Sequence, residues 1–118
     1  MKARIPDDLA PLVEQLMLLH EVVPGAAETL QAQIEERLAQ VREHGGPDRD
    51  AMRRDGQSWI ELILTYLQHA LDEGRTLTET ALRGDPITGE TYLYRLTQTA
   101  ALCEAAIEAY RWAAREET

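Results

Sequence analysis

The sequence predicts an all-α protein, a bundle of four main helices and one short helix. Apolar residues recur at steps of three and four, which is the period of an amphipathic helix. Phe is absent, so Leu, Ala, Ile and Val supply most of the apolar side chains, and this composition suits helix packing. Glycine and proline interrupt the pattern at 24–25, 45–47 and 84–89. With 118 residues, the chain has the length of one domain, spanning residues 1–118.

The first helix is expected over roughly 9–23. Asp7 or Asp8 can accept hydrogen bonds from its first N–H groups and so cap it. Pro11 then falls in the first turn, where its missing N–H costs little. Pro24 ends this helix because proline cannot continue the hydrogen-bond ladder.

A second helix is expected over roughly 26–43, followed by a charged loop. The helix carries an apolar stripe on one face and charged residues on the other. Gly45, Gly46 and Pro47 form a strong stop signal. The stretch 45–57 has no apolar period and mixes aspartates with arginines, so we interpret it as a loop.

The stretch Trp59–Leu71 is the one against which we expect the other helices to pack. Its apolar residues cover most of a helical surface, and a helix that is apolar on nearly every side has neighbours on nearly every side. Ser58 and Glu61 form an S-x-x-E capping box at its start. Gly74 is expected to end it.

Two more helices follow the central one. Thr76 and Glu79 offer a second capping box, for the short helix, which is expected to end at Gly84. The last helix is expected over about 90–115, with a heptad-like apolar seam. At 1.5 Å per residue it would be roughly 37 Å long. That length is large for so small a domain, so we expect part of it in a subunit interface of a homo-oligomer, a dimer or larger.

Charge and cysteine content narrow the set of partners. The formal net charge of -9 argues against general nucleic-acid and anionic-membrane binding, because both need a basic surface. No stretch approaches the length of a membrane span. The apolar run 16–19 is too short for a signal peptide. Cys103 is the only cysteine, so no intrachain disulfide can form. We therefore expect a cytoplasmic protein.

Three blocks from residue 36 onward, covering about two-thirds of the chain, match the motifs of a known family. The blocks are Glu36, Arg37 and Gln40 followed by His44-Gly45; Trp59–Leu71; and Tyr92–Arg111, in which Leu96, Gln98, Ala100, Ala101, Ile107 and Glu108 fall in place. In composition, order and spacing they resemble the phage and bacterial MazG-like branch of the all-α nucleoside triphosphate pyrophosphohydrolases. The resemblance implies a MazG-like bundle and a nucleotide as the ligand.

The resemblance also implies where a site would lie. Members of the family carry an E-x-x-E pair on one helix and an E-x-x-D pair on the next, and the spacing places each pair on one helical face. The carboxylates hold Mg²⁺, which neutralises a triphosphate and activates water. Here the four positions are Tyr66, His69, Arg95 and Gln98, which cannot replace hard oxygen ligands. We therefore expect no standard Mg²⁺ site, assign no catalytic residue and expect no cofactor.

Three functions stay open. The leading hypothesis is a family relative without the Mg²⁺-dependent activity that uses Tyr66, His69, Arg95 and Gln98 to bind a nucleotide, another phosphorylated small molecule or a partner. In it, the Arg95 guanidinium takes the place of the lost cation and pairs with phosphate. A second is an active Mg²⁺-dependent pyrophosphohydrolase with relocated carboxylates, drawn from Glu35, Glu36, Asp48, Asp50, Glu104 and Glu108. A third is a structural or regulatory helix module without a small ligand.

Each candidate site has a simpler explanation that the sequence alone leaves standing. Arg95 can pair with a neighbouring acid such as Glu61 or Glu90 in a site that has lost its function. The acids proposed as relocated ligands can form a solvated face, which is the usual state of acidic residues in a chain of this composition.

Overall fold

The computed structural model describes residues 5–116, with the side chains of all but 51–53 and 116, and that part of the chain is all-α. Its helices are α1 (Ala10–Val22), α2 (Ala26–His44), α3 (Pro47–Arg53), α4 (Gly56–Leu82) and α5 (Glu90–Glu116). The predicted fold class is confirmed, with four main helices and one short one. Within residues 5–116, no helix combines the length and the hydropathy needed to cross a membrane.

The chain forms two compact units, Met1–Ala32 and Gln33–Thr118. The first unit holds α1 and the start of α2. The second holds the rest of α2 together with α3, α4 and α5. The expectation of a single domain over 1–118 stays a prediction.

In the first unit, α1 begins and ends close to the expected positions. Its first turn contains Pro11, as predicted, but the N-cap residue is Leu9 and no side chain caps the helix. The expected cap by Asp7 or Asp8 is therefore wrong. The break between α1 and α2 includes Gly25, whose φ of 88° lies in the left-handed region that glycine adopts without strain.

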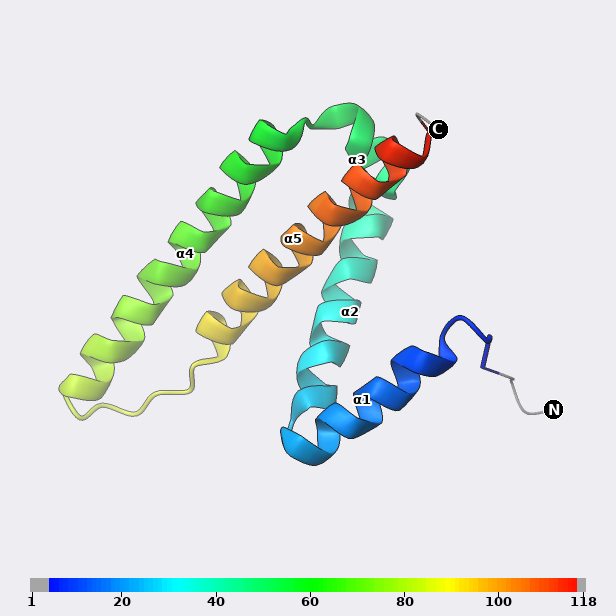
Figure 1. The fold of residues 1–118 in the computed structure, drawn as a ribbon. Helices are drawn as coiled ribbons and strands as arrows, with labels where there is room; N and C mark the ends of the chain where they lie inside the picture. Colours follow the sequence, from blue (N-terminus) through cyan, green and yellow to red (C-terminus); the bar gives the residue numbers. More distant parts are fainter. Residues whose placement is uncertain (1–4, 117–118) are drawn as a thin grey trace. The chain divides into compact units, whose positions relative to one another are not determined.

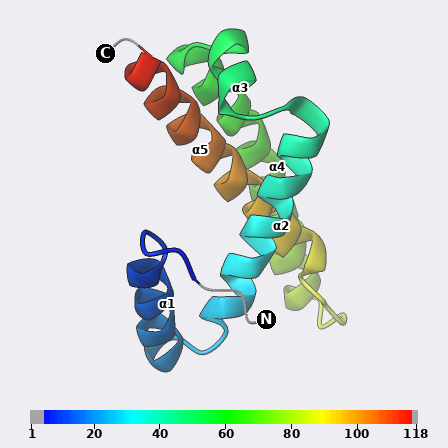
Figure 2. The ribbon, with the colours of Figure 1, turned by 90° about the vertical axis from the view of Figure 1, so that its right-hand side faces the viewer.

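In the second unit, α4 and α5 lie side by side and run antiparallel, and α3 packs against α5 (Figures 1 and 2). Small residues of α5 form its inner face: Ala101, Ala105 and Ala109 lie one turn apart and are all buried. Residues four apart share one face of a helix, and alanine there lets the partner helix approach closely. Trp59 of α4 is buried against Ala105 and Ala109.

Helix α4 continues through Gly74, so the expected end of the central helix and the separate short helix after Thr76 are wrong. The reason is a tertiary contact. A Cβ at position 74 would lie 3.3 Å from Cε1 of Tyr92 in α5, so glycine serves here to admit a ring rather than to end a helix. Thr76 also does not cap a helix, because its hydroxyl donates to the carbonyl of Asp72 inside α4.

The short helix of the structure is α3, which lies within the stretch 45–57 that we interpreted as a loop. Pro47 stands in its first turn, where proline is favoured, and Asp48 and Asp50 follow in the same turn. Acidic side chains at that end interact favourably with the helix dipole. These local features favour a helix even though the segment has no apolar period.

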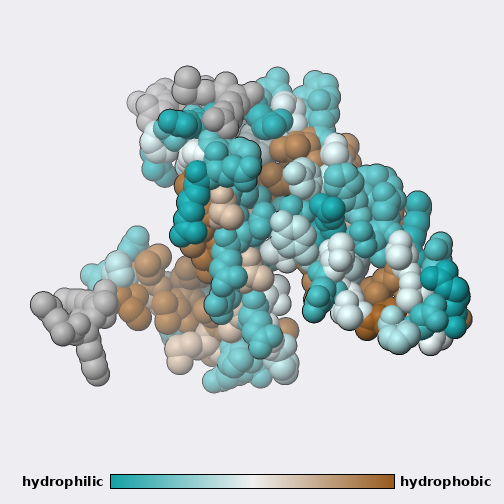
Figure 3. Space-filling model, turned by 180° about the vertical axis from the view of Figure 1, so that it is seen from behind, coloured by the Kyte–Doolittle hydropathy of each residue, from teal (hydrophilic) through white to brown (hydrophobic). Residues whose placement is uncertain are grey.

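One face of α4 is open, which contradicts the expectation of neighbours on nearly every side. Ile60, Leu64, Leu67 and Leu71 are 47–56% exposed. They follow one another at steps of three and four, so they form one stripe, which we call the outer face of α4. In the view from behind, hydrophobic surface lies in separate patches among hydrophilic side chains (Figure 3). Helix α5 covers the adjoining side, where Ala70 is buried.

The start of α4 is capped by Asp55 and not by Ser58. An Oδ1 atom of Asp55 accepts a hydrogen bond of 2.8 Å from the backbone N–H of Ser58, and the helix begins at Gly56. Ser58 is therefore the third residue of the helix and supplies the capped N–H group.

Replacing the capping carboxylate tests this arrangement. We expect Asp55→Ala to lower the free energy of unfolding by roughly 1 kcal/mol, the usual cost of losing a side-chain cap. Asp55→Asn, which keeps an acceptor oxygen, should cost less. Urea denaturation followed by circular dichroism measures both. A larger loss in Ser58→Ala than in Asp55→Ala would contradict the assignment.

Candidate functional site

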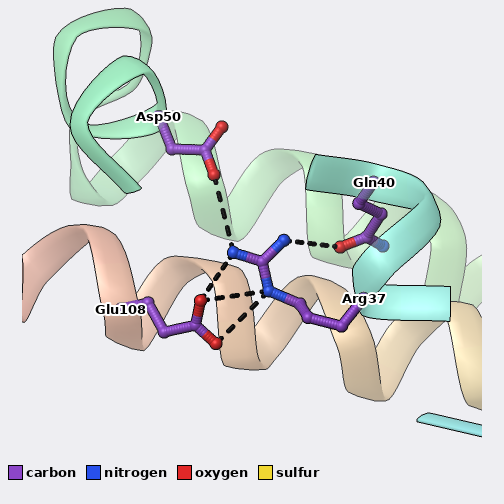
Figure 4. A network of polar contacts seen from close by, with 4 residues as sticks. All are labelled: Arg37, Gln40, Asp50 and Glu108. Carbon is purple, nitrogen blue, oxygen red and sulfur yellow. Dashed lines mark hydrogen bonds and ion pairs between the residues drawn. The ribbon is translucent and has the colours of Figure 1, made fainter. Parts of the chain in front are cut away.

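The most extensive polar contact of the second unit is centred on Arg37 of α2 (Figure 4). Its guanidinium binds the carboxylate of Glu108 in α5 through Nη2 at 2.6 Å and through Nε at 3.1 Å. Nη1 donates to Oε1 of Gln40 at 3.4 Å, and Nη2 lies 3.9 Å from Oδ2 of Asp50 in α3. We call these four residues the Arg37 network.

The geometry of the Arg37 network follows from side-chain chemistry. Arg37 and Gln40 stand three residues apart on α2 and so share a face. The planar guanidinium fork matches a carboxylate with two parallel N–H groups. The Arg37 side chain is only 11% exposed, whereas that of Glu108 is 42% exposed. The pair is therefore shielded on one side and open to solvent on the other.

Three members of the Arg37 network, Arg37, Gln40 and Asp50, form one wall of a cavity of about 430 Å³ within the second unit. Helix α2 contributes Glu36, Arg37, Ala39, Gln40, Glu43 and His44 to the lining, and α3 contributes Asp50. Trp59, Leu62 and Tyr66 come from α4, and Tyr94, Gln98, Leu102 and Ala105 come from α5. Arg54, between α3 and α4, completes the lining. The volume falls in the ordinary range of small-molecule sites, roughly 300–1,000 Å³. Aromatic rings, amides, carboxylates and guanidinium groups all face it.

Two of the four residues predicted from the family positions line this cavity, namely Tyr66 and Gln98. The other two stand beside them. His69 is exposed, and its ring centroid lies 5.6 Å from that of Tyr66. Arg95 donates from Nη1 to Oε1 of Gln98 at 3.1 Å. The lining residues of the predicted site are thus Tyr66 and Gln98, with His69 and Arg95 as their neighbours.

Arg95 affects the cavity through Gln98 rather than by facing it. With its carbonyl oxygen bound to Arg95, Gln98 donates from Nε2 to the hydroxyl of Tyr94 at 3.2 Å. These two bonds fix the orientation of the amide. Nε of Arg95 is buried and has no hydrogen-bond partner among the described residues.

The six acids of the relocated-carboxylate hypothesis divide into two sets. Glu36 and Asp50 line the cavity, Glu108 reaches its wall through Arg37, and Glu104 interacts with Glu108. Glu35 and Asp48 are exposed and do not line it. Within the described residues, no three His, Cys, Asp or Glu side chains are placed to hold a metal ion. The guanidinium of Arg37 is the cation between Asp50 and Glu108.

Sequence reasoning did not assign Arg37, Gln40, Trp59 or Tyr94 to a site. The only signal for Arg37 and Gln40 was the E-R-x-x-Q spacing, which places them with Glu36 on α2. Glu36, Arg37 and Gln40 all line the cavity.

Trp59 contributes an indole N–H that is buried and has no acceptor among the described residues. The guanidinium of Arg54 lies 5.7 Å from the centroid of its ring, within the range of a cation–π interaction. Arg54 also donates from Nη1 to the hydroxyl of Ser58 at 3.3 Å. Arg54 and Trp59 thus lie together at the lining of the cavity. The indole N–H of Trp59 and further N–H groups of Arg54 make no hydrogen bond to the described residues.

Comparison of the chain with models of protein families, with curated proteins and with solved structures gives no match. The resemblance to the MazG-like family therefore stays a prediction.

Burial raises the pKa of the Glu104 carboxyl, and repulsion from Glu108 raises it further, while Arg37 acts in the opposite direction. A carboxyl whose pKa is raised by folding binds its proton more tightly in the native state than in the unfolded state. Its ionisation therefore lowers the stability of the protein as the pH rises through and above the ordinary range of a glutamate pKa.

Substitution of Arg37 tests how much the Arg37 network contributes to the free energy of unfolding. We expect Arg37→Lys to lower the free energy of unfolding by about 1–2 kcal/mol, because lysine keeps the charge but cannot offer the two-pronged contact to Glu108. The partial exposure of Glu108 keeps the figure at this level. Arg42→Lys, an exposed position of the same helix, is the matched control. Equal effects of the two substitutions in urea denaturation would refute the role of the contact.

Glu104→Gln tests the pKa shift. The variant should be more stable than the wild type at pH 7, because it removes a charge that the folded state disfavours. The difference should shrink as the pH falls below about 4, where the wild-type carboxyl becomes protonated in both states. Glu61→Gln, at an exposed position of α4, serves as the control. A stability difference that is independent of pH would exclude titration of Glu104 as its cause.

Proposed function

We propose that the protein binds a nucleotide, or the nucleoside part of one, in the cavity formed by α2, α3, α4 and α5, and that binding does not need Mg²⁺. In this proposal the protein is a MazG-like relative that has kept a nucleotide site without the hydrolytic activity. The observation that carries the proposal is the lining of the cavity, in which aromatic rings stand next to side-chain amides.

The lining suits a flat heteroaromatic base. Trp59, Tyr66 and Tyr94 offer ring faces, and a base stacked on such a face gains on the order of 1–3 kcal/mol. Gln40 and Gln98 each offer both a donor and acceptors, as the edge of a base requires. An acceptor atom on the ligand would also give the buried indole N–H of Trp59 the partner that it lacks among the described residues.

The charges of the lining indicate which part of the ligand goes where. Glu36, Glu43 and Asp50 would repel a phosphate, and Arg37 is already bound to two carboxylates. Arg54 has no carboxylate partner in the described contacts, so we assign the phosphate to it. The base then occupies the part of the cavity near Tyr66 and Gln98.

Binding is favoured over hydrolysis by the donor set. Mg²⁺ needs several oxygen ligands in near-octahedral arrangement, and phosphoryl chemistry in a metal site needs the ion to polarise the phosphate or activate water. Asp50 and Glu108, two of the candidate ligands, instead neutralise the guanidinium of Arg37. The acids near the cavity therefore do not fit an Mg²⁺ site as they stand.

A thermal-shift screen tests the proposal. Nucleosides and nucleoside mono-, di- and triphosphates are added with Mg²⁺ and again with a chelator. We expect at least one of them to raise the melting temperature equally in both conditions, because a ligand that binds only the folded state stabilises it by mass action. Titration followed by tryptophan fluorescence then gives the Kd.

Matched substitutions locate the site. Tyr66→Ala removes a ring from the lining and should weaken binding at least tenfold, about 1.4 kcal/mol. His69→Ala removes the neighbouring ring outside the lining and should change the Kd by less than threefold. Stabilisation that requires the metal would replace this proposal with the pyrophosphohydrolase that uses relocated carboxylates. The absence of any shift would favour the helix module without a small ligand.

A further inference from the structure

The second unit leaves its branched aliphatic side chains partly or largely exposed. Among its described residues, the buried apolar ones are Trp59, Ala70, Ala101, Ala105 and Ala109, and no Leu, Ile or Val belongs to this set. Helix–helix contacts in a stable domain normally bury branched aliphatic side chains. The interior of this unit is therefore incomplete on the outer face of α4.

The outer face of α4 borders a groove. Between α4 and α5 lies a second depression of about 420 Å³, separate from the cavity described above, whose walls include Leu64, Leu67 and Leu71 of α4 and Tyr92 and Leu96 of α5. Ile60 extends the same stripe by one turn. Together, these half-exposed side chains offer on the order of 500 Å² of apolar surface, as much as the largest patches on ordinary monomers, which are often functional.

The charge pattern of this surface is unlike that of the rest of the chain. The protein carries 21 acidic residues and a formal charge of -9. Yet the stretch from Leu62 to Leu71 contains no Asp, Glu, Lys or Arg, and the stretch from Thr91 to Cys103 contains Arg95 alone. Two copies of an acidic protein repel each other, and this repulsion is weakest where the facing surfaces carry no carboxylate.

We propose that a second copy of this chain covers the outer face of α4 and the groove beside it. Two such surfaces facing each other across a two-fold axis would be the same patch on both subunits, in which ridges of one copy enter the groove of the other. Each copy contributes about 800 Å² to a standard stable interface, of which the apolar surface described above supplies more than half. The interface lies mainly on α4, whereas the heptad-like pattern of the sequence had pointed to the last helix.

The proposal does not depend on the nucleotide site, because the groove and the cavity share no lining residue. Sedimentation velocity of the full chain should give at least twice the 13.3 kDa of one copy at micromolar concentration. Leu67→Glu should raise the dissociation constant at least 100-fold by placing two carboxylates in an apolar contact. Leu82→Glu, the same change on the same helix at an 83% exposed residue outside the groove, should leave it within threefold.

A measurement on the wild type covers the case in which Leu67→Glu fails to fold. Hydrogen–deuterium exchange is recorded above and below the dissociation constant, and amides of residues 60–71 should become at least tenfold more protected on association. A monomer at every concentration would overturn the proposal, as would an oligomer whose formation leaves exchange in 60–71 unchanged. Either result would assign the outer face of α4 to another part of the same chain or to a different partner.

Discussion

The second unit depends on a largely shielded cation, the guanidinium of Arg37. Helix α2 is joined to α5 by the side chain of Arg37 rather than by close backbone packing, and the same guanidinium reaches α3 through Asp50. An unpaired charge in a shielded position is costly, so the pairing of Arg37 with carboxylates stabilises the arrangement. The positions of Glu108, Asp50 and Gln40 are therefore linked to one another, and with them the shape of the cavity wall that Arg37, Gln40 and Asp50 form.

The alanine stripe of α5 is the second constraint. Small side chains at Ala101, Ala105 and Ala109 bring α4 close, so the larger side chains are pushed to the flanks of the hairpin. On one flank, Trp59, Tyr66 and Tyr94 line the cavity against α2. On the other flank, leucines line the groove. The alanine stripe of α5 thus leaves an aromatic, polar surface on one flank of the helix pair and an aliphatic, uncharged surface on the other. The two surfaces suit different ligands.

Periodicity and helix breakers were sufficient to predict the fold class and the limits of α2 and α5, because those signals are local. The sequence failed where a distant residue decides the outcome. Gly74 has the local pattern of a helix end, but the ring of Tyr92 determines its role. The family positions led to Tyr66 and Gln98 at the cavity. The contact between Arg37 and Glu108 joins residues 71 positions apart, and no spacing rule connects such a pair.

The contact between Gly74 and Tyr92 also sets the register of the hairpin. Because the ring of Tyr92 lies within 3.3 Å of the place where a Cβ at position 74 would stand, it packs closely against α4 at the glycine, and sliding α5 along α4 would break this contact. A slip by one helical turn, about 5.4 Å, would carry Gln98 out of line with Tyr66. A glycine near one end of the hairpin thereby acts as an alignment mark for side chains two turns away, and a bulkier residue there would misalign the site without touching it.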